Sequence, residues 1–283
     1  MVRVPVPEQM VEAARQFAAD ARTAADPRNA ATVVLMRQGA GPEVYLLRRQ
    51  LSMAFAGGMC VFPGGGVDPR DFDSTLGWAG PSAEDWARVL GVDAELARAL
   101  VCAAVRETFE ESGVLLAGPT SGEVVADTTG EDWEADRVAL ERRDLSLTSF
   151  LARRGLVLRS DLLGAWSGWL TPEFEPRRYR TWFFVAELPA GQRTRDVSSE
   201  SDQVWWVPAG EAVRQVDADE VMMLPPTYLT CVEIAHHRSP GSVLAAARSR
   251  TVEMFTPELV EVDGVATLSS PPWVGPLLDG GAR

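Results

Sequence analysis

The residues most able to do chemistry in this chain of 283 residues are three glutamates in one short run, R-E-T-F-E-E-S-G-V. Glu107, Glu110 and Glu111 share one face of a helix, because successive helical residues turn by about 100°. Like charges on one helix face repel, and anions near the C-terminal end of a helix also oppose its dipole. Clustered carboxylates suit Mg²⁺ or Mn²⁺. We therefore predict that a divalent cation holds these glutamates together; the alternative is a solvated acidic helix end.

The residues around the glutamates make this run a motif. Arg106 lies four residues before Glu110, within reach of the acidic cluster, and Gly113 can end the helix in a left-handed conformation. Five fixed residues, R-E-x-x-E-E-x-G, are expected by chance on the order of once in 10⁴ chains of this size. The run resembles the core of the Nudix box, G-x(5)-E-x(7)-R-E-U-x-E-E-x-G-U, where U is apolar. Val114 fills the last apolar position, and Thr108 departs from the first.

The glycine-rich half of the box is present, but an insertion follows it. In the family a strand runs into a Pro-Gly-Gly loop, which Phe62 to Gly66 (F-P-G-G-G) matches here. Five residues separate Gly65 from Asp71, where the family has glutamate, and the role of Asp71 stays open. Between Asp71 and Arg106 lie 34 residues instead of seven, an excess of 27. Residues 72–92 are polar and punctuated by Pro and Gly, so we expect them outside the central sheet.

A narrower resemblance covers residues 28–238. The order of features is similar to the branch of Nudix hydrolases that includes the peroxisomal coenzyme A diphosphatases, whose box carries a long insertion. The shared features include F-P-G-G followed by V-D, the inserted segment and the box helix. They also include W-x-T-P-x(4)-R-R-Y-x-T-x-F-F from Trp169 to Phe184 and L-P-P-T from Leu224 to Thr227.

A further motif before the box bears on the substrate. Coenzyme A-cleaving members carry L-L-T-x-R-(S/A)-x(3)-R-x(3)-G-x(3)-F-P-G-G. Leu46, Arg49 and Gly58 fit this motif, whereas Leu47 stands at the threonine and Ala54 at the second arginine. The match is partial, so the resemblance suggests coenzyme A or acyl-coenzyme A as substrate without fixing it.

The family resemblance implies hydrolysis of a phosphoanhydride bond in a nucleotide-containing substrate, with Mg²⁺ or Mn²⁺ as cofactor. Glu200 lies in a polar loop just before Trp205 and Trp206, and we predict it as an extra ligand or base. A plain hairpin loop is the alternative reading of that segment, and Glu187 is a second candidate. The predicted metal ligands are Glu107, Glu110 and Glu111, the predicted catalytic residues are Glu107, Glu110, Arg106 and Glu200, and the predicted substrate contacts are Arg48, Arg49, Gly64, Gly65 and Gly66.

Other functions stay open. ADP-ribose, a nucleotide sugar or a dinucleoside polyphosphate could replace coenzyme A as substrate. The alternative class is a non-catalytic regulatory protein of the Nudix fold that binds nucleotides, since a fold does not fix a function. Loss of box glutamates would indicate that class, and the helix retains all three.

Composition limits partners and location. The chain is 46% hydrophobic and 24% charged, as expected for a globular protein, and its net charge of −13 argues against binding nucleic acid. No run of about 18 apolar residues predicts a membrane span, and the N-terminus lacks the apolar core of a signal peptide, so we expect a cytoplasmic protein. We expect Cys60, Cys102 and Cys231 to be buried free thiols. The sequence leaves a homodimer open.

Strands alternating with helices predict an α/β fold. The resemblance implies a Nudix-type α/β/α sandwich with a mixed sheet and an insertion at about 72–98 within the box. It divides the chain into an N-terminal helix (1–27), a Nudix domain (28–238) and a C-terminal extension (239–283) that packs on the domain. The expected helices are 7–25, 83–90, 93–112, 145–153, 208–216 and 226–236, the expected strands are 31–37, 43–49, 59–62, 165–170, 181–188 and 203–207, and a surface loop is expected at 118–137.

Overall fold

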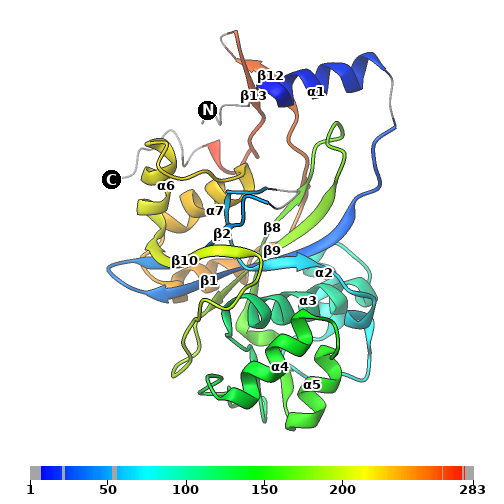
Figure 1. Ribbon diagram of the computed structural model, residues 1–283, viewed down its shortest axis with the longest axis vertical. Helices are drawn as coiled ribbons and strands as arrows, with labels where there is room; N and C mark the ends of the chain where they lie inside the picture. Colours follow the sequence, from blue (N-terminus) through cyan, green and yellow to red (C-terminus); the bar gives the residue numbers. More distant parts are fainter. Residues whose placement is uncertain (1–7, 21–22, 53–55, 263, 276, 278–283) are drawn as a thin grey trace.

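The central feature of the computed structural model, which describes residues 8–20, 23–52, 56–262, 264–275 and 277, is a mixed eight-stranded sheet (Figure 1). Its main path runs β10-β2-β1-β9-β8-β11, with β3 paired to β2 and β4 paired to β1. β1 and β9 are parallel, as are β8 and β11. The bounds are β1 Arg28–Gln38, β2 Pro42–Arg49, β3 Cys60–Val61, β4 Gly64–Gly66, β8 Leu163–Leu170, β9 Tyr179–Glu187, β10 Ser201–Pro208 and β11 Met254–Phe255.

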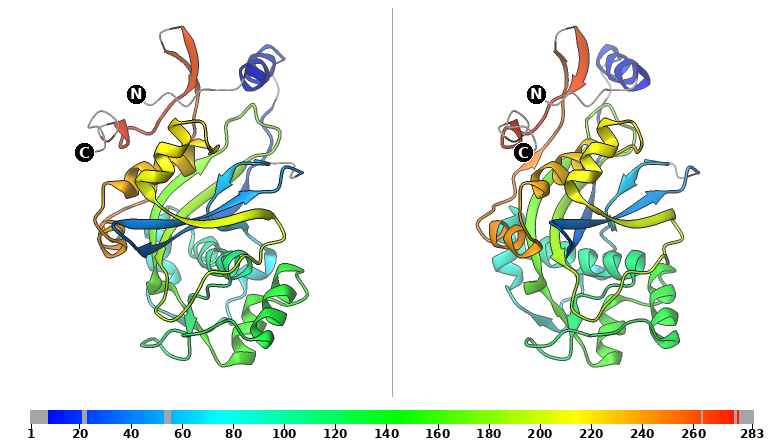
Figure 2. Two further views of the ribbon diagram at one scale, coloured as in Figure 1. Left: turned by 60° about the vertical axis from the view of Figure 1, so that its left-hand side comes forward. Right: turned by 90° about the vertical axis from the view of Figure 1, so that its left-hand side faces the viewer.

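Helices cover both faces of this sheet (Figures 1 and 2). Along β1, Val33 and Leu35 pack into the core beneath α2 and α3, whereas Val34 and Met36 pack into a second core with α6, α7 and α8. This alternation follows from the two-residue period of a strand, and it confirms the predicted α/β/α sandwich. The helices are α2 Ala83–Leu90, α3 Ala94–Ser112, α6 Ala209–Asp217, α7 Pro225–Ala235 and α8 Pro240–Ala247.

The long helix α3 carries the box glutamates, and its ends are those predicted. The Asp93 side chain accepts a hydrogen bond from the Leu96 amide at 2.8 Å, which caps the N-terminus. Gly113 ends the helix at φ 74°, and a Cβ there would lie 2.7 Å from Nε of Arg195. Only glycine satisfies both constraints without strain, so α3 ends directly after its acidic turn.

The insertion folds beside α3 and stays outside the central sheet, as predicted. The short 3-10 turn η1 (Pro69–Phe72) leads into it, and it contains the strand β5 (Trp78–Ala79) and α2. β5 joins a small separate sheet with β7 (Val157–Arg159) and β6 (Ala117–Gly118). A second 3-10 turn, η2 (Ser160–Leu162), then leads into β8.

Two expectations need correction. The segment 118–137 is not all loop, because α4 (Glu131–Glu141) begins within it and is followed by α5 (Leu147–Arg154). α4 reads as polar in sequence and begins without a side-chain cap, yet it buries Leu140 and Arg137. The N-terminal helix α1 (Glu8–Ala19) ends six residues early, and its predicted start at Pro7 lies outside the described residues. Beyond residue 239, the chain adds β11 to the main sheet, before a hairpin of β12 (Leu259–Val262) and β13 (Val265–Leu268).

Two further expectations concern the chain as a whole. Cys60, Cys102 and Cys231 are free and buried, as predicted. Among the described residues, no helix has both the length and the apolar character needed to cross a membrane.

Candidate active site

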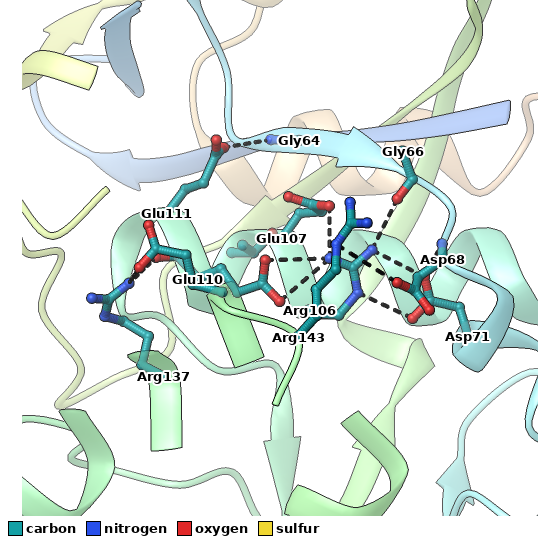
Figure 3. A network of polar contacts seen from close by, with 12 residues as sticks. Gly64, Gly66, Asp68, Asp71, Arg106, Glu107, Glu110, Glu111, Arg137 and Arg143 are labelled. Atoms are coloured by element: carbon teal, nitrogen blue, oxygen red, sulfur yellow. Dashed lines mark hydrogen bonds and ion pairs between the residues drawn. The ribbon is translucent and has the colours of Figure 1, made fainter. Parts of the chain in front are cut away.

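Arg106 lies at the centre of a network of polar contacts on the C-terminal half of α3 (Figure 3). Its Nη1 donates to Oε1 of Glu107 at 2.7 Å and to both carboxylate oxygens of Glu110 at 3.3 Å. Its Nε and Nη2 donate to the two carboxylate oxygens of Asp71 at 3.1 and 3.0 Å, and Nη2 also donates to the Gly66 carbonyl at 2.9 Å. One guanidinium fork therefore joins α3, β4 and η1.

Asp71, whose role the sequence left open, is a structural partner of the box helix. Its side chain is only 2% exposed, and it also accepts a hydrogen bond from the Asp68 amide at 2.8 Å, which caps η1. A carboxylate buried this deeply needs a cation beside it, and Arg106 is that cation. The long insertion therefore separates the two halves of the box in sequence but not in space.

The glycines of β4 bring the backbone against the acidic face. β4 pairs antiparallel with β1, with Gly64 opposite Thr32. The Gly64 amide donates to Oε2 of Glu111 at 2.7 Å. A Cβ on Gly65 would lie 2.5 Å from Oε1 of Glu107, so a side chain there would displace the carboxylate. The predicted glycine loop and the predicted acidic helix therefore meet.

Burial dominates the electrostatics of the three glutamates. Burial raises the pKa of Glu110 to about 8, with a smaller contribution from the charge of Glu107. Burial also raises the pKa of Glu107, although the Arg106 charge opposes that rise. Burial raises the pKa of Glu111 well above its usual value. Arg106 faces the carboxyl groups of Asp71, Glu107 and Glu110 with a single positive charge, so it cannot balance all three in their ionised forms.

The donor set fits a divalent cation by its chemistry, because it offers several hard carboxylate oxygens on one helix face, whose ionised forms a cation would stabilise. Within the described part of the chain, no three His, Cys, Asp or Glu side chains converge as a finished metal cage. Glu107 and Glu110 turn toward Arg106, and Glu111 turns toward the Gly64 amide. A cation would have to compete with these hydrogen bonds for the carboxylate oxygens.

Glu200 lies in the segment between β9 and β10, on the same side of the sheet as α3. Burial raises the pKa of Glu107 and Glu111 most, and the charge of Glu200 adds a smaller rise at both, which is consistent with a position near the acidic cluster. Its carboxylate accepts a hydrogen bond from Nη2 of Arg49 at 3.2 Å, and its side chain remains 54% exposed. The structure thus brings this residue toward the α3 glutamates but leaves it in water.

The two candidate arginines point to opposite faces of β2. Leu47 belongs to the core beneath α3 and Leu46 to the core beneath α7, so strand alternation puts Arg49 on the α3 side. The charge of Arg49 accordingly lowers the pKa of Glu111, against a larger effect of burial. Arg48 instead pairs with Asp202 at 2.7 Å on the other side. Ala54, the position of the missing arginine, lies outside the described residues.

Two residues of this region, Arg137 and Glu141 of α4, were not predicted from the sequence. Nη1 of Arg137 donates to the Glu110 carbonyl at 2.7 Å, and the Arg137 side chain is only 3% exposed. Its spacing from Glu134 and Glu141, three and four residues away, is the ion-pair pattern of a helix and could have indicated α4.

The second candidate acid, Glu187, lies on β9 opposite Met36 of β1 in the sheet. This is the opposite end of β1 from the residues that pair with β4.

A helix of glutamates held by an arginine and packed against a glycine strand, within an α/β/α sandwich, defines the Nudix class of proteins. The model of the NUDT19 Nudix domain family matches residues 88–234, more than half of the chain, and the chain belongs to this family. The family predicted from the box is therefore confirmed.

Similar proteins agree with this assignment. The chain is 26% identical over 239 residues to an acyl-coenzyme A diphosphatase NUDT19 of Xenopus laevis, which covers 69% of this chain and 60% of the relative. It is 25% identical over 250 residues to the protein of the same name from Gallus gallus, with 75% and 66% covered. The chain therefore spans only about three fifths of these relatives. A solved Nudix hydrolase from Alicyclobacillus acidocaldarius is 28% identical and superposes with a TM-score of 0.66, over 81% of this chain and 98% of that structure.

Proposed function

We propose that this protein is a Mg²⁺- or Mn²⁺-dependent hydrolase that cleaves the phosphoanhydride bond of a nucleotide-containing small molecule, with coenzyme A or an acyl-coenzyme A as its substrate. The observation that carries the proposal is the intact acidic face of α3, held by Arg106 and closed by the glycines of β4. A stability argument alone does not account for three glutamates whose pKa values burial has raised.

The residues of α3 would hold the cofactor. Glu107, Glu110 and Glu111 are the proposed ligands, and Arg106 sets the orientation of the first two through hydrogen bonds to their carboxylates. When bound there, the divalent cation would supply the positive charge that offsets the charge of the diphosphate oxygens. The Gly64 amide, which now donates to Glu111, fixes how close β4 comes to that face.

Glu200 and Arg49 supply the remaining proposed roles. Glu200 is exposed to water and faces the acidic cluster, so its carboxylate can take a proton from the attacking water. Arg49 lies on the same face and now pairs with Glu200, and its guanidinium can bind a substrate phosphate in a forked geometry. Arg48 is the weaker choice for this contact because it points to the other side of β2.

The substrate part of the proposal rests on two supports. The relatives from Xenopus laevis and Gallus gallus carry the name acyl-coenzyme A diphosphatase. The motif residues Leu46, Arg49 and Gly58 lead into the glycine strand in the order that coenzyme A-cleaving members show. Cleavage of the anhydride in coenzyme A yields 3′,5′-ADP and 4′-phosphopantetheine.

A substrate screen tests the proposal. The protein is incubated with Mg²⁺ and, in turn, coenzyme A, an acyl-coenzyme A, ADP-ribose, a nucleotide sugar and a dinucleoside polyphosphate, and the products are identified by mass. We expect 3′,5′-ADP from coenzyme A and its thioester, and no product after chelation. Cleavage of ADP-ribose with intact coenzyme A would refute the substrate assignment alone. Full activity after exhaustive chelation would refute the mechanism.

A further inference from the structure

The segment that carries Glu200 is held from two sides by hydrogen bonds to its backbone. On the β2 side, the Gln50 amide donates to the Glu200 carbonyl at 3.0 Å, and Nε2 of Gln50 donates to the Ser199 carbonyl at 2.8 Å. On the α4 side, Oε1 of Glu141 accepts from the Ser199 amide at 3.1 Å and from the Ser199 hydroxyl at 2.6 Å. Two donors on one carboxylate oxygen make Glu141 a strong anchor for this exposed segment.

Glu141 is itself fixed to the end of the box helix. Its other oxygen, Oε2, accepts from Nη1 of Arg137 at 3.2 Å, and the same nitrogen donates to the Glu110 carbonyl at 2.7 Å. Arg137 is buried, so its bond to the Glu110 carbonyl is shielded from solvent, whereas the side chain of Glu141 is partly exposed. A continuous path of hydrogen bonds therefore runs from the backbone of a box glutamate through α4 to the residue before Glu200.

We propose that Glu141 is a positioning residue for Glu200, so that α4 sets where the Glu200 carboxylate stands relative to the acidic face of α3. The catalytic part of this inference rests on the proposed hydrolase function; the placement of the segment does not. Within the described part of the chain, the Glu200 carboxylate accepts a side-chain hydrogen bond from Arg49 alone, so its position depends on the backbone that Glu141 anchors.

A matched pair of variants separates anchoring from charge. Glu141→Met keeps the length and helix preference of the side chain but removes the acceptor, whereas Glu141→Gln keeps an acceptor oxygen for Ser199 and removes the charge facing Arg137. Glu134→Met is the control, because Glu134 is another carboxylate on Arg137 but has no hydrogen bond to the Ser199 segment. Thermal melts establish that each variant is folded.

Amide hydrogen exchange reads the anchor without reference to activity. The Ser199 amide should exchange roughly five- to tenfold faster in Glu141→Met, because one hydrogen bond is lost. In Glu141→Gln and Glu134→Met it should stay within about twofold of the unchanged protein. Equal exchange in Glu141→Met and Glu141→Gln would overturn the inference.

Kinetics then test the link to Glu200. Glu141→Met should lower kcat about fivefold with KM nearly unchanged, and Glu141→Gln should restore most of that loss. In a Glu200→Gln background the same Glu141→Met change should cost less than about twofold, because its effect acts through a carboxylate that is already absent. Multiplicative losses would overturn the inference. If the unchanged protein hydrolyses none of the screened compounds, the proposed function fails, and the exchange measurement alone decides whether Glu141 anchors the segment.

Discussion

The acidic face of α3 and the Glu200 segment both present glutamates to the same region, but they are positioned by different means. Glu107 and Glu110 are nearly buried, share Arg106, and sit on a helix whose period fixes their spacing. Glu200 is more than half exposed and depends on contacts from α4 and β2. A helix sets the local order of its side chains, whereas a loop takes its geometry from the elements around it.

The difference also appears in the charges. Removal from water raises the pKa of the three box glutamates, Glu107, Glu110 and Glu111, and for Glu110 burial and the charge of Glu107 raise it to about 8. A buried carboxylate cluster of this kind is costly unless a cation compensates for it, and Arg106 does so only in part. Under the proposed function, the α3 glutamates would bind the divalent cation, and Glu200, which is exposed to water, would accept a proton from the attacking water.

Neutralising box glutamates should have the largest effect on activity. Glu110→Gln and Glu111→Gln should each slow turnover by about 10² or more, because a charged ligand is lost where transition-state charge builds. Both variants should remain folded, since the change relieves repulsion between buried carboxylates.

Glu200→Gln should slow turnover only about tenfold, below the usual range for a general base, because the side chain is exposed and held by one arginine. Steady-state turnover rates measure each loss, and thermal melts establish that each variant is folded. A larger loss of turnover in Glu200→Gln than in Glu110→Gln and Glu111→Gln would contradict the comparison.

The two arginines of β2 provide a smaller, sharper contrast. Arg49→Ala should raise KM for coenzyme A roughly tenfold, about 1.4 kcal/mol of binding, with a smaller change in kcat. Arg48→Ala should leave KM within about twofold, because its side chain pairs with Asp202 on the other side of the strand. Initial rates over a range of substrate concentrations decide between them. An equal rise in KM for both variants would show that strand alternation does not select the phosphate contact.

The box helix and most of the sheet could be predicted from the sequence because their signals are local. The N-cap Asp93 and the left-handed Gly113 fall where the spacing placed them, and α2 has the predicted bounds. Strands such as β2 and β9 follow runs of apolar and β-branched residues. These signals need no knowledge of what packs against the element.

The rest of the site depends on contacts between distant segments. Asp71 meets Arg106 across an insertion of unknown path, and no local pattern predicts that the chain returns to the helix. α4 is polar and uncapped by a side chain, so its helical character comes largely from burying Arg137 and Leu140. The anchor on Ser199 then depends on α4 being in place. Such pairings are properties of the assembled fold, which a single sequence does not display.

Binding of Mn²⁺, followed by electron paramagnetic resonance of the free ion, tests the central claim most directly. The unchanged protein should bind Mn²⁺, and the triple variant Glu107→Gln, Glu110→Gln, Glu111→Gln should lose at least about 10²-fold in affinity, because three charged oxygen donors become neutral. Glu200→Gln serves as the comparison and should retain binding within about tenfold, since it contributes at most one exposed ligand. A folded triple variant that binds Mn²⁺ as tightly as the unchanged protein would contradict the assignment of the α3 face as the metal site.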